Sequence, residues 1–123
     1  MSKEASCSCG ALRTICDGTP ELVSLCHCNA CQKRTGAPFG IAAFFLRNSV
    51  RMEGDYKSYQ RMSDSGNQVT FNFCVNCGST VFWETSRKPD FVAVAVGAFT
   101  DAGFPKPSKE VHTDCRHHWI EPL

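Results

Sequence analysis

The chain lacks a long apolar segment, and it lacks an excess of either charge. No apolar run in its 123 residues approaches the ~20 residues that a membrane-spanning helix needs. The N-terminal sequence MSKEASCSCG also lacks the apolar stretch of a signal peptide. Thirteen Lys and Arg against twelve Asp and Glu leave a net charge of +1, which predicts no general attraction to nucleic acid or anionic membranes. We expect a cytoplasmic protein of one domain, residues 1–123, that binds neither nucleic acid nor membranes.

Cysteine, in contrast, is abundant, with nine residues in this short chain. A disulfide framework would suit a secreted domain, but the number of cysteines is odd and most of them lie only one or two residues apart. Such close pairs make poor disulfides and good metal chelates. The cysteines therefore predict metal sites.

Seven of the cysteines form three short motifs. They are CxC at Cys7 and Cys9, CxCxxC at Cys26, Cys28 and Cys31, and CxxC at Cys74 and Cys77. The turn of a CxxC motif can direct both sulfurs to one ion, and its backbone amides can donate to the thiolates. Gly78 follows such a turn and can adopt a positive φ angle. Several of these motifs in one chain indicate zinc rather than redox chemistry.

Seven cysteines cannot fill two tetrahedral four-cysteine sites. Either an outlying residue such as Cys115 or His112 completes the second site, or one zinc keeps three protein ligands and an open position, as catalytic zinc ions do. Spacing alone does not decide which cysteines share an ion. A natural division places Cys7, Cys9, Cys74 and Cys77 in a closed site and leaves Cys26, Cys28 and Cys31 for the other.

Most of the remaining sequence is typical of β-strands. Alternating or continuous apolar patterns predict strands over residues 11–16, 21–26, 40–46, 69–74, 80–85 and 91–99. Turn signals separate them at 17–20, near 47, at 63–67 and at 86–90. Residues 29–36 could hold a short helical turn capped by Gly36, and 100–110 read as a loop before the strand-like EVHT. We expect an all-β, mainly antiparallel fold.

Five motifs together resemble a known family. CSCGALR, CHCNACQKRTGAPF, FCVNCGSTVFWE, VAVGAFTD and VHTDCRHHWIEP occur in this order between Cys7 and Pro122. In order and spacing they resemble the glutathione-dependent formaldehyde-activating enzyme family, whose domain is also found in centromere protein V. The resemblance implies a compact, tent-like β fold with two zinc ions. It assigns Cys7, Cys9, Cys74 and Cys77 to a structural zinc and Cys26, Cys28 and Cys31 to a catalytic zinc.

The same resemblance implies a carbon-sulfur lyase that runs in the synthetic direction, joining formaldehyde to glutathione as S-(hydroxymethyl)glutathione. Independently of the family, a zinc held by three thiolates is a weak Lewis acid but binds an incoming thiol as a thiolate. We therefore expect the open position to receive the substrate thiol, or alternatively the aldehyde oxygen. The expected partners are a small thiol such as glutathione and a small aldehyde.

Glutathione carries carboxylates, so cationic residues are expected near the catalytic zinc. Arg34 is the preferred contact because guanidinium binds carboxylates in a bidentate manner, and Lys33 lies beside it in the sequence. Phe39 is a candidate for the pocket wall. Three further arginines, Arg47, Arg51 and Arg61, are interpreted as surface residues.

The isolated histidines and cysteines receive no firm catalytic role. His27 lies between two presumed ligands, where packing or a hydrogen bond beside the metal site is the expected role. Three C-terminal histidines, His112, His117 and His118, are interpreted as structural or surface residues, with a proton shuttle as the alternative. Cys16 is expected to be a small buried residue. Cys115 is either a free thiol or a fourth zinc ligand.

Two classes of function remain open from the sequence. The first is the zinc-dependent enzyme of thiol and aldehyde chemistry. The second is a non-catalytic, zinc-stabilised protein-binding module, because metal-driven folding is sufficient reason to keep cysteines in a small domain. An exchangeable zinc ligand would favour the enzyme, and two inert zinc ions would favour the binding module.

Overall fold

The computed structural model describes residues 1–123, and β-strands dominate it. The strands are β1 (Ser2–Ser6), β2 (Arg13–Asp17), β3 (Leu22–Cys26), β4 (Gly40–Leu46), β5 (Val50–Glu53), β6 (Tyr56–Met62), β7 (Gln68–Cys74), β8 (Thr80–Thr85), β9 (Phe91–Ala95) and β10 (Lys109–Val111). The helical elements are α1 (Asn29–Thr35) and three short 3₁₀ turns, η1 (Arg47–Ser49), η2 (Val96–Phe99) and η3 (Thr113–Cys115). The expected all-β, mainly antiparallel fold is confirmed. No helix has the length and hydrophobicity that crossing a membrane requires.

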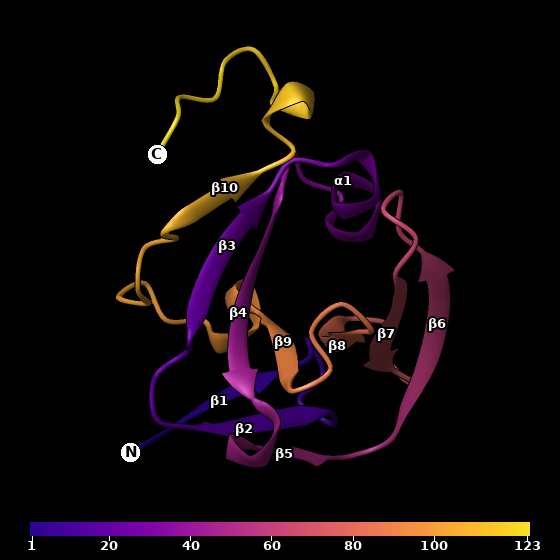
Figure 1. The fold of residues 1–123 in the computed structure, drawn as a ribbon. Helices are drawn as coiled ribbons and strands as arrows, with labels where there is room; N and C mark the ends of the chain where they lie inside the picture. The colour runs from indigo at the N-terminus through magenta and orange to yellow at the C-terminus, as the bar shows by residue number, and fades with distance from the viewer.

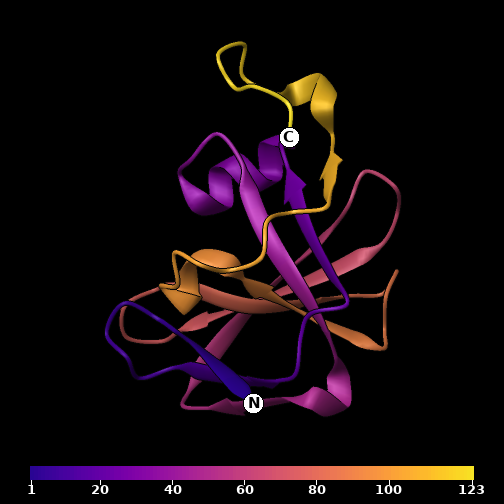
Figure 2. The same cartoon turned by 90° about the vertical axis from the view of Figure 1, so that its left-hand side faces the viewer.

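The strands form two sheets. β1, β2 and β5 make a small antiparallel sheet, and the other seven strands make a larger one in the order β10-β3-β4-β9-β8-β7-β6. Within the larger sheet only β10 and β3 run parallel. The small sheet lies at one end of β3 and β4, and α1 and the C-terminal segment lie at the other (Figures 1 and 2). The larger sheet bends between these ends, so that β6 and β7 stand opposite β3 and β4 (Figure 1).

Alternation along the central strands gives the larger sheet two different apolar faces. In β4, Phe45 belongs to the main core, which also takes in Leu12 and Cys16 from the small-sheet side of the molecule. Its neighbour Phe44 points the other way, toward a second cluster that contains Trp83. The same alternation recurs along β9 and between Phe82 and Trp83 of β8, because successive strand residues face opposite sides of a sheet. The first face stabilises the fold, and the second is free to line a cavity.

Several predicted elements are confirmed, and others needed correction. The strands predicted at 21–26, 40–46, 69–74 and 80–85 coincide with β3, β4, β7 and β8 to within one residue, and α1 ends at Gly36 with φ of 71° as expected. The strand predicted over 91–99 is too long, because the chain turns into η2 at Val96. Three strands were not predicted at all, namely β1, β5 and β6.

Candidate metal and substrate site

One cysteine cluster joins the two sheets. Cys7 and Cys9 lie in the turn after β1, Cys74 ends β7 and Cys77 lies in the turn that follows it, yet their four sulfurs are all within 4.8 Å of one another. The Sγ of Cys9 lies 3.6 Å from that of Cys7 and 3.7 Å from that of Cys74. A tetrahedral zinc with Zn–S bonds of about 2.3 Å requires sulfurs about 3.8 Å apart. The cluster therefore has the dimensions of a closed four-thiolate zinc site.

Backbone amides support the charge of this cluster. The amide of Leu12 donates to Sγ of Cys7 at 3.2 Å, and the amide of Asn76 donates to Sγ of Cys74 at 3.3 Å. Hydrogen bonds with Ser79, chiefly from its hydroxyl, lower the pKa of Cys77 to about 5. Such donors stabilise thiolates, which are the form that binds metal.

The second cluster is built where β3 passes into α1. Cys26 ends β3, Cys28 is the N-cap of α1 and accepts a hydrogen bond from the amide of Cys31 at 3.4 Å, and Cys31 lies in the first turn of the helix. The three sulfurs lie within 4.8 Å of one another. No further Cys, His, Asp or Glu of the chain places a ligand atom in this group.

Within this triplet the surroundings of Cys31 favour its thiolate form. A hydrogen bond from Cys26 lowers the pKa of Cys31 to about 5, against the effect of burial, and Cys28 and the Arg34 guanidinium lower it further. The same hydrogen bond, together with burial, raises the pKa of Cys26. The cluster is thus a set of coupled thiols beside a cation, which is suited to becoming a metal-binding thiolate set.

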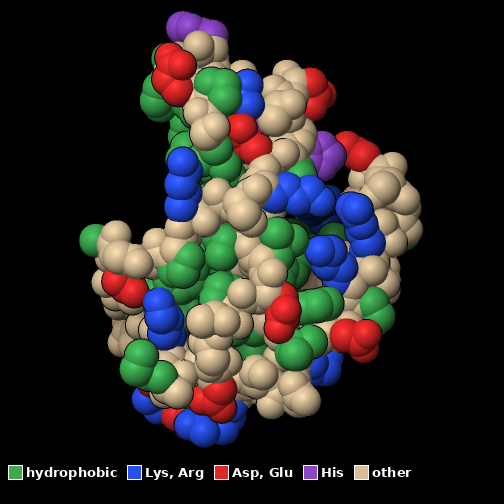
Figure 3. Space-filling view, turned by 60° about the vertical axis from the view of Figure 1, so that its left-hand side comes forward, with side chains coloured by type: hydrophobic (Ala, Val, Ile, Leu, Met, Phe, Trp, Pro, Cys, Tyr) green, Lys and Arg blue, Asp and Glu red, His purple; other side chains and the backbone are tan.

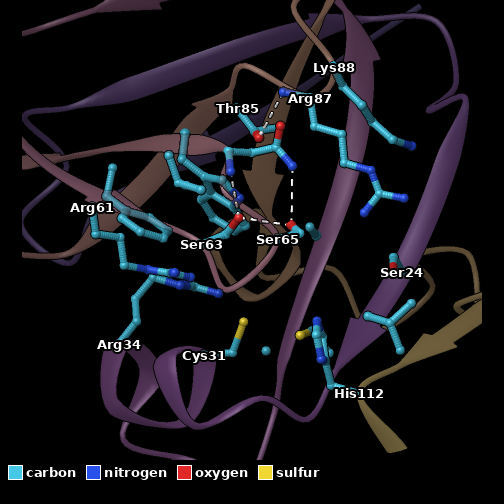
Figure 4. A pocket seen from close by; sticks show the side chains of 18 of the residues that line it. Ser24, Cys31, Arg34, Arg61, Ser63, Ser65, Thr85, Arg87, Lys88 and His112 are labelled. Carbon is cyan, nitrogen blue, oxygen red and sulfur yellow. Dashed lines mark hydrogen bonds between the residues drawn. The ribbon is translucent and has the colours of Figure 1, made fainter.

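A cavity of about 210 Å³ opens beside the triplet, on the second face of the larger sheet. Cys26 and Cys31 line one end, and the apolar wall is formed by Phe44, Phe71 and Trp83. In Figure 4, Cys31 and His112 face the cavity at the end nearest α1, and Arg87 and Lys88 reach in from the opposite end. The residues that could hold a metal therefore adjoin a space that could hold a small molecule.

The same cavity is strongly cationic. Arg34, Arg61, Arg87 and Lys88 line it, and no Asp or Glu does. The Arg34 guanidinium lies 4.2 Å from the centre of the Trp83 ring, and both Arg34 and Arg61 lie within 6 Å of the Phe71 ring, at 5.8 Å and 5.5 Å. Cation–π contacts of this kind fix the guanidinium planes without neutralising their charge.

The structure brings together only part of the predicted substrate contacts. Arg34 lines the cavity next to Cys31, whereas Lys33 is exposed on another side of α1 and lines a separate depression with His117. Phe39 packs edge-on against His27, with ring centres 6.2 Å apart, and is not part of the cavity wall. Their positions therefore give no support to substrate contacts from Lys33 and Phe39.

The interpretation of Arg61 as a surface residue is corrected, because it lines the cavity from the end of β6. Arg87 and Lys88, in the turn between β8 and β9, also line the cavity. No sequence signal marks these residues, since each belongs to a different segment from the cysteines and only the bend of the sheet brings them together. Arg47 and Arg51 lie outside the cavity in ion pairs with Glu84 and Glu53.

The histidines and cysteines outside the two clusters also have defined positions in the structure. His27 is fully buried, and its Nε2 donates to Oε2 of Glu110 at 2.7 Å, in agreement with a hydrogen bond beside the metal site. Cys16 is buried in β2 as expected. His112 has a positive φ of 53° and lines the mouth of the cavity. Cys115 lies close enough to Cys28 for the two charges to interact, but its sulfur is not part of the triplet.

Comparison with known proteins agrees with this geometry. The family model described as glutathione-dependent formaldehyde-activating enzyme matches residues 2–115. The chain belongs to this formaldehyde-activating enzyme family. A search of curated proteins found no match.

A solved structure shares the fold of this formaldehyde-activating family member. It is the crystal structure of a Rhodobacter sphaeroides protein determined as a structural genomics target. The two are 21% identical with a TM-score of 0.61, over 87% of this chain and 98% of the other. At this identity the likeness concerns the fold.

Both cysteine clusters fit zinc, on the evidence of their own chemistry. Sulfur separations, amide donors and the thiolate-favouring surroundings of Cys31 and Cys77 all match what zinc requires. They differ in one respect, since the first cluster offers four protein ligands and the second offers three. By the rule that structural zinc sites are closed and catalytic sites keep a position for a substrate, only the second is suited to chemistry.

Proposed function

We propose that the protein is a zinc-dependent carbon-sulfur lyase-type enzyme that joins a small thiol to a small aldehyde, as in the formation of S-(hydroxymethyl)glutathione. One observation supports this most directly. The cluster of Cys26, Cys28 and Cys31 includes no fourth protein ligand and opens into a cavity of about 210 Å³. A site with only a structural task would have no need of such a cavity.

Cys26, Cys28 and Cys31 would hold the zinc ion, which would supply a position where a thiol is stable as its thiolate at neutral pH. The cavity then presents that sulfur to an aldehyde held beside it, so that two molecules react as a preoriented pair. One S–C bond forms, the carbonyl oxygen becomes a hydroxyl, and the proton lost from the thiol ends on that hydroxyl. No oxidant or reductant is needed.

Residues of the cavity have defined tasks in this proposal. Arg34 offsets the negative charge of the thiolate set, because its guanidinium lies beside Cys31. Phe71 and Trp83 form an apolar wall that keeps water from the reacting atoms and holds Arg34 by stacking. His112, which also lines the cavity, would pass a proton to the product hydroxyl in this proposal.

The test must separate catalysis from the spontaneous combination of thiols and aldehydes. Exchange spectroscopy by NMR on glutathione with formaldehyde gives the interconversion rate with and without zinc-loaded protein. We expect the rate to rise in proportion to protein concentration. Cys28→Ser is expected to return it to the uncatalysed value and to lower bound zinc from two ions per chain to one.

Cys115→Ser is the matched control, because Cys115 is a nearby thiol outside the triplet. It should keep both zinc ions and the acceleration. A protein that holds two zinc ions yet leaves the exchange rate at the uncatalysed value would contradict the proposal and favour the protein-binding module. Loss of one zinc ion in Cys115→Ser would show instead that the second site is closed by a fourth cysteine.

A further inference from the structure

The arginines of this protein fall into two groups that differ in their ion pairing. The four that lie outside the cavity are each paired with a carboxylate, namely Arg13, Arg47, Arg51 and Arg116. The three that line the cavity, Arg34, Arg61 and Arg87, make no ion pair with a carboxylate, and neither does Lys88; Arg34 alone has an anionic neighbour, the thiolate of Cys31. In a chain with nearly equal numbers of acidic and basic residues, this division concentrates uncompensated positive charge in one place.

Acidic residues exist close by in the sequence but do not enter the cavity. Asp64 lies in the turn between β6 and β7, and Asp90 follows Lys88 in the turn before β9, yet neither lines the space. On the face shown in Figure 3, several basic side chains gather beside a histidine, and an acidic side chain lies on the other side of that histidine. Like charges held together without a carboxylate between them repel one another, so an anion that binds among Arg61, Arg87 and Lys88 is favoured.

The unpaired groups are also held in position. Arg34 and Arg61 extend toward each other from α1 and β6, and both contact the Phe71 ring (Figure 4). Nε of Arg34 is buried without an acceptor. At the other end, the ammonium of Lys88 lies 4.9 Å from the centre of the Phe44 ring. A buried donor without a partner, next to stacked guanidiniums, is a binding position for a carboxylate oxygen.

We propose that this cavity selects its thiol substrate by negative charge and binds thiols that carry two or more anionic groups. It disfavours an ammonium group on the substrate, because no Asp or Glu lines the cavity to pair with it. The proposal rests on the proposed function for the place of the sulfur, at Cys26, Cys28 and Cys31. Arg61, beside Arg34, and Arg87 and Lys88, at the opposite end of the cavity, then receive the anionic groups. Anionic thiols with a blocked or missing amine bind better than zwitterionic ones.

The test uses thioethers, which have no thiol to react, so that recognition is measured apart from catalysis. Isothermal titration of the zinc-loaded protein is carried out with S-methylglutathione, its N-acetyl derivative and its diethyl ester. We expect N-acetylation to tighten binding several-fold, and esterification to weaken it about tenfold or more, because charge-assisted hydrogen bonds are lost. Added salt should reduce affinity for the two acids more than for the ester.

Substitutions of the cavity arginines test which residues bind the anionic groups. Arg61→Gln and Arg87→Gln should each weaken binding of N-acetyl-S-methylglutathione about fivefold to tenfold while zinc content stays at the wild-type value. Arg51→Gln is the matched control, since Arg51 is exposed, paired with Glu53 at 3.3 Å and outside the cavity. It should bind like the wild type.

Equal affinity for the acid and the diester, tighter binding of the amine than of its N-acetyl form, or wild-type affinity in both cavity variants would overturn this proposal. Normal charge selection without acceleration of the thiol–aldehyde exchange would instead overturn the proposed function and leave the anion site standing. The two failures are thus distinguishable.

Discussion

At the scale of single residues, Gly40 controls the position of Arg34. A Cβ atom on Gly40 would lie 2.6 Å from a terminal nitrogen of Arg34 and 3.5 Å from Cβ of Cys31. The fold can tolerate this change, because the end of an arginine side chain moves easily, but the guanidinium would leave its place over Trp83. We expect Gly40→Ala to keep both zinc ions and the melting temperature within a few degrees. Its affinity for S-methylglutathione should fall about tenfold, as measured by titration.

Gly97→Ala is the control for this substitution. An added Cβ at Gly97 meets no atom within 4 Å, and the residue has no positive φ. It should bind S-methylglutathione like the wild type. If Gly40→Ala bound equally well, Arg34 would not contribute to recognition from its observed position.

The candidate site shows what could be predicted from residues alone. The cysteine clusters could be predicted, because metal-binding turns bring their ligands together over one or two intervening residues. Arg34 could be predicted by its place three residues after Cys31. Arg61 and Lys88 could not, because nothing in their local sequence distinguishes a cavity arginine from a surface arginine, and only long-range strand order brings them to the cysteines.

At the scale of elements, the position of β10 depends on the carboxylate of Glu110. Oε1 of Glu110 accepts from Arg116 at 2.9 Å and Oε2 accepts from the buried His27 at 2.7 Å, so Glu110 ties the C-terminal segment to the turn that holds the triplet. We expect Glu110→Gln to loosen β10 and to speed hydrogen exchange of amides in 109–111 about tenfold, as followed by mass spectrometry. His27 should exchange faster too, because its amide donates to the carbonyl of Val111.

Glu53→Gln is the control, since Glu53 pairs with Arg13 and Arg51 on the small sheet. It should leave exchange in β10 unchanged.

The pKa of Glu110 is lowered, first by the hydrogen bond from His27 and then by Arg116. Its contribution to stability is therefore present above the ordinary carboxyl pKa of 4.5 and is lost as the pH falls through the lowered value. Unchanged exchange in Glu110→Gln would show that backbone pairing alone holds the strand.

Elements differ in how well sequence predicts them, for physical reasons. β4 and β8 lie inside the sheet and show strong apolar patterns, so their bounds were predicted correctly. β6 is an edge strand with nearly every residue exposed, and no apolar alternation marks it. The apolar run of β9 continues into η2 because Phe99 still packs in the main core, and hydrophobicity does not distinguish a buried turn from a strand.

At the scale of the whole molecule, the two cysteine clusters contribute differently to the stability of the fold. The first joins segments 65 residues apart, through Cys9 and Cys74, and connects the turn after β1 with the turn after β7. The second lies within six consecutive residues, Cys26 to Cys31, and cross-links only one local turn. Zinc binding to structural sites contributes about 10–16 kcal/mol in small domains, which is as large as the whole stability of a typical domain, about 5–15 kcal/mol.

Removal of metal should therefore occur in two distinguishable stages. As a chelator is titrated in, we expect the first zinc to leave the triplet without change in far-ultraviolet circular dichroism, and the second to leave the four-cysteine cluster together with cooperative unfolding. Cys9→Ser should accordingly unfold, or lose tens of degrees in melting temperature, whereas Cys28→Ser should hold one zinc and stay folded, because the long-range cross-link is intact. Simultaneous release of both ions with unfolding, or a folded Cys9→Ser that retains one zinc, would show that the local cluster and not the long-range one stabilises the molecule.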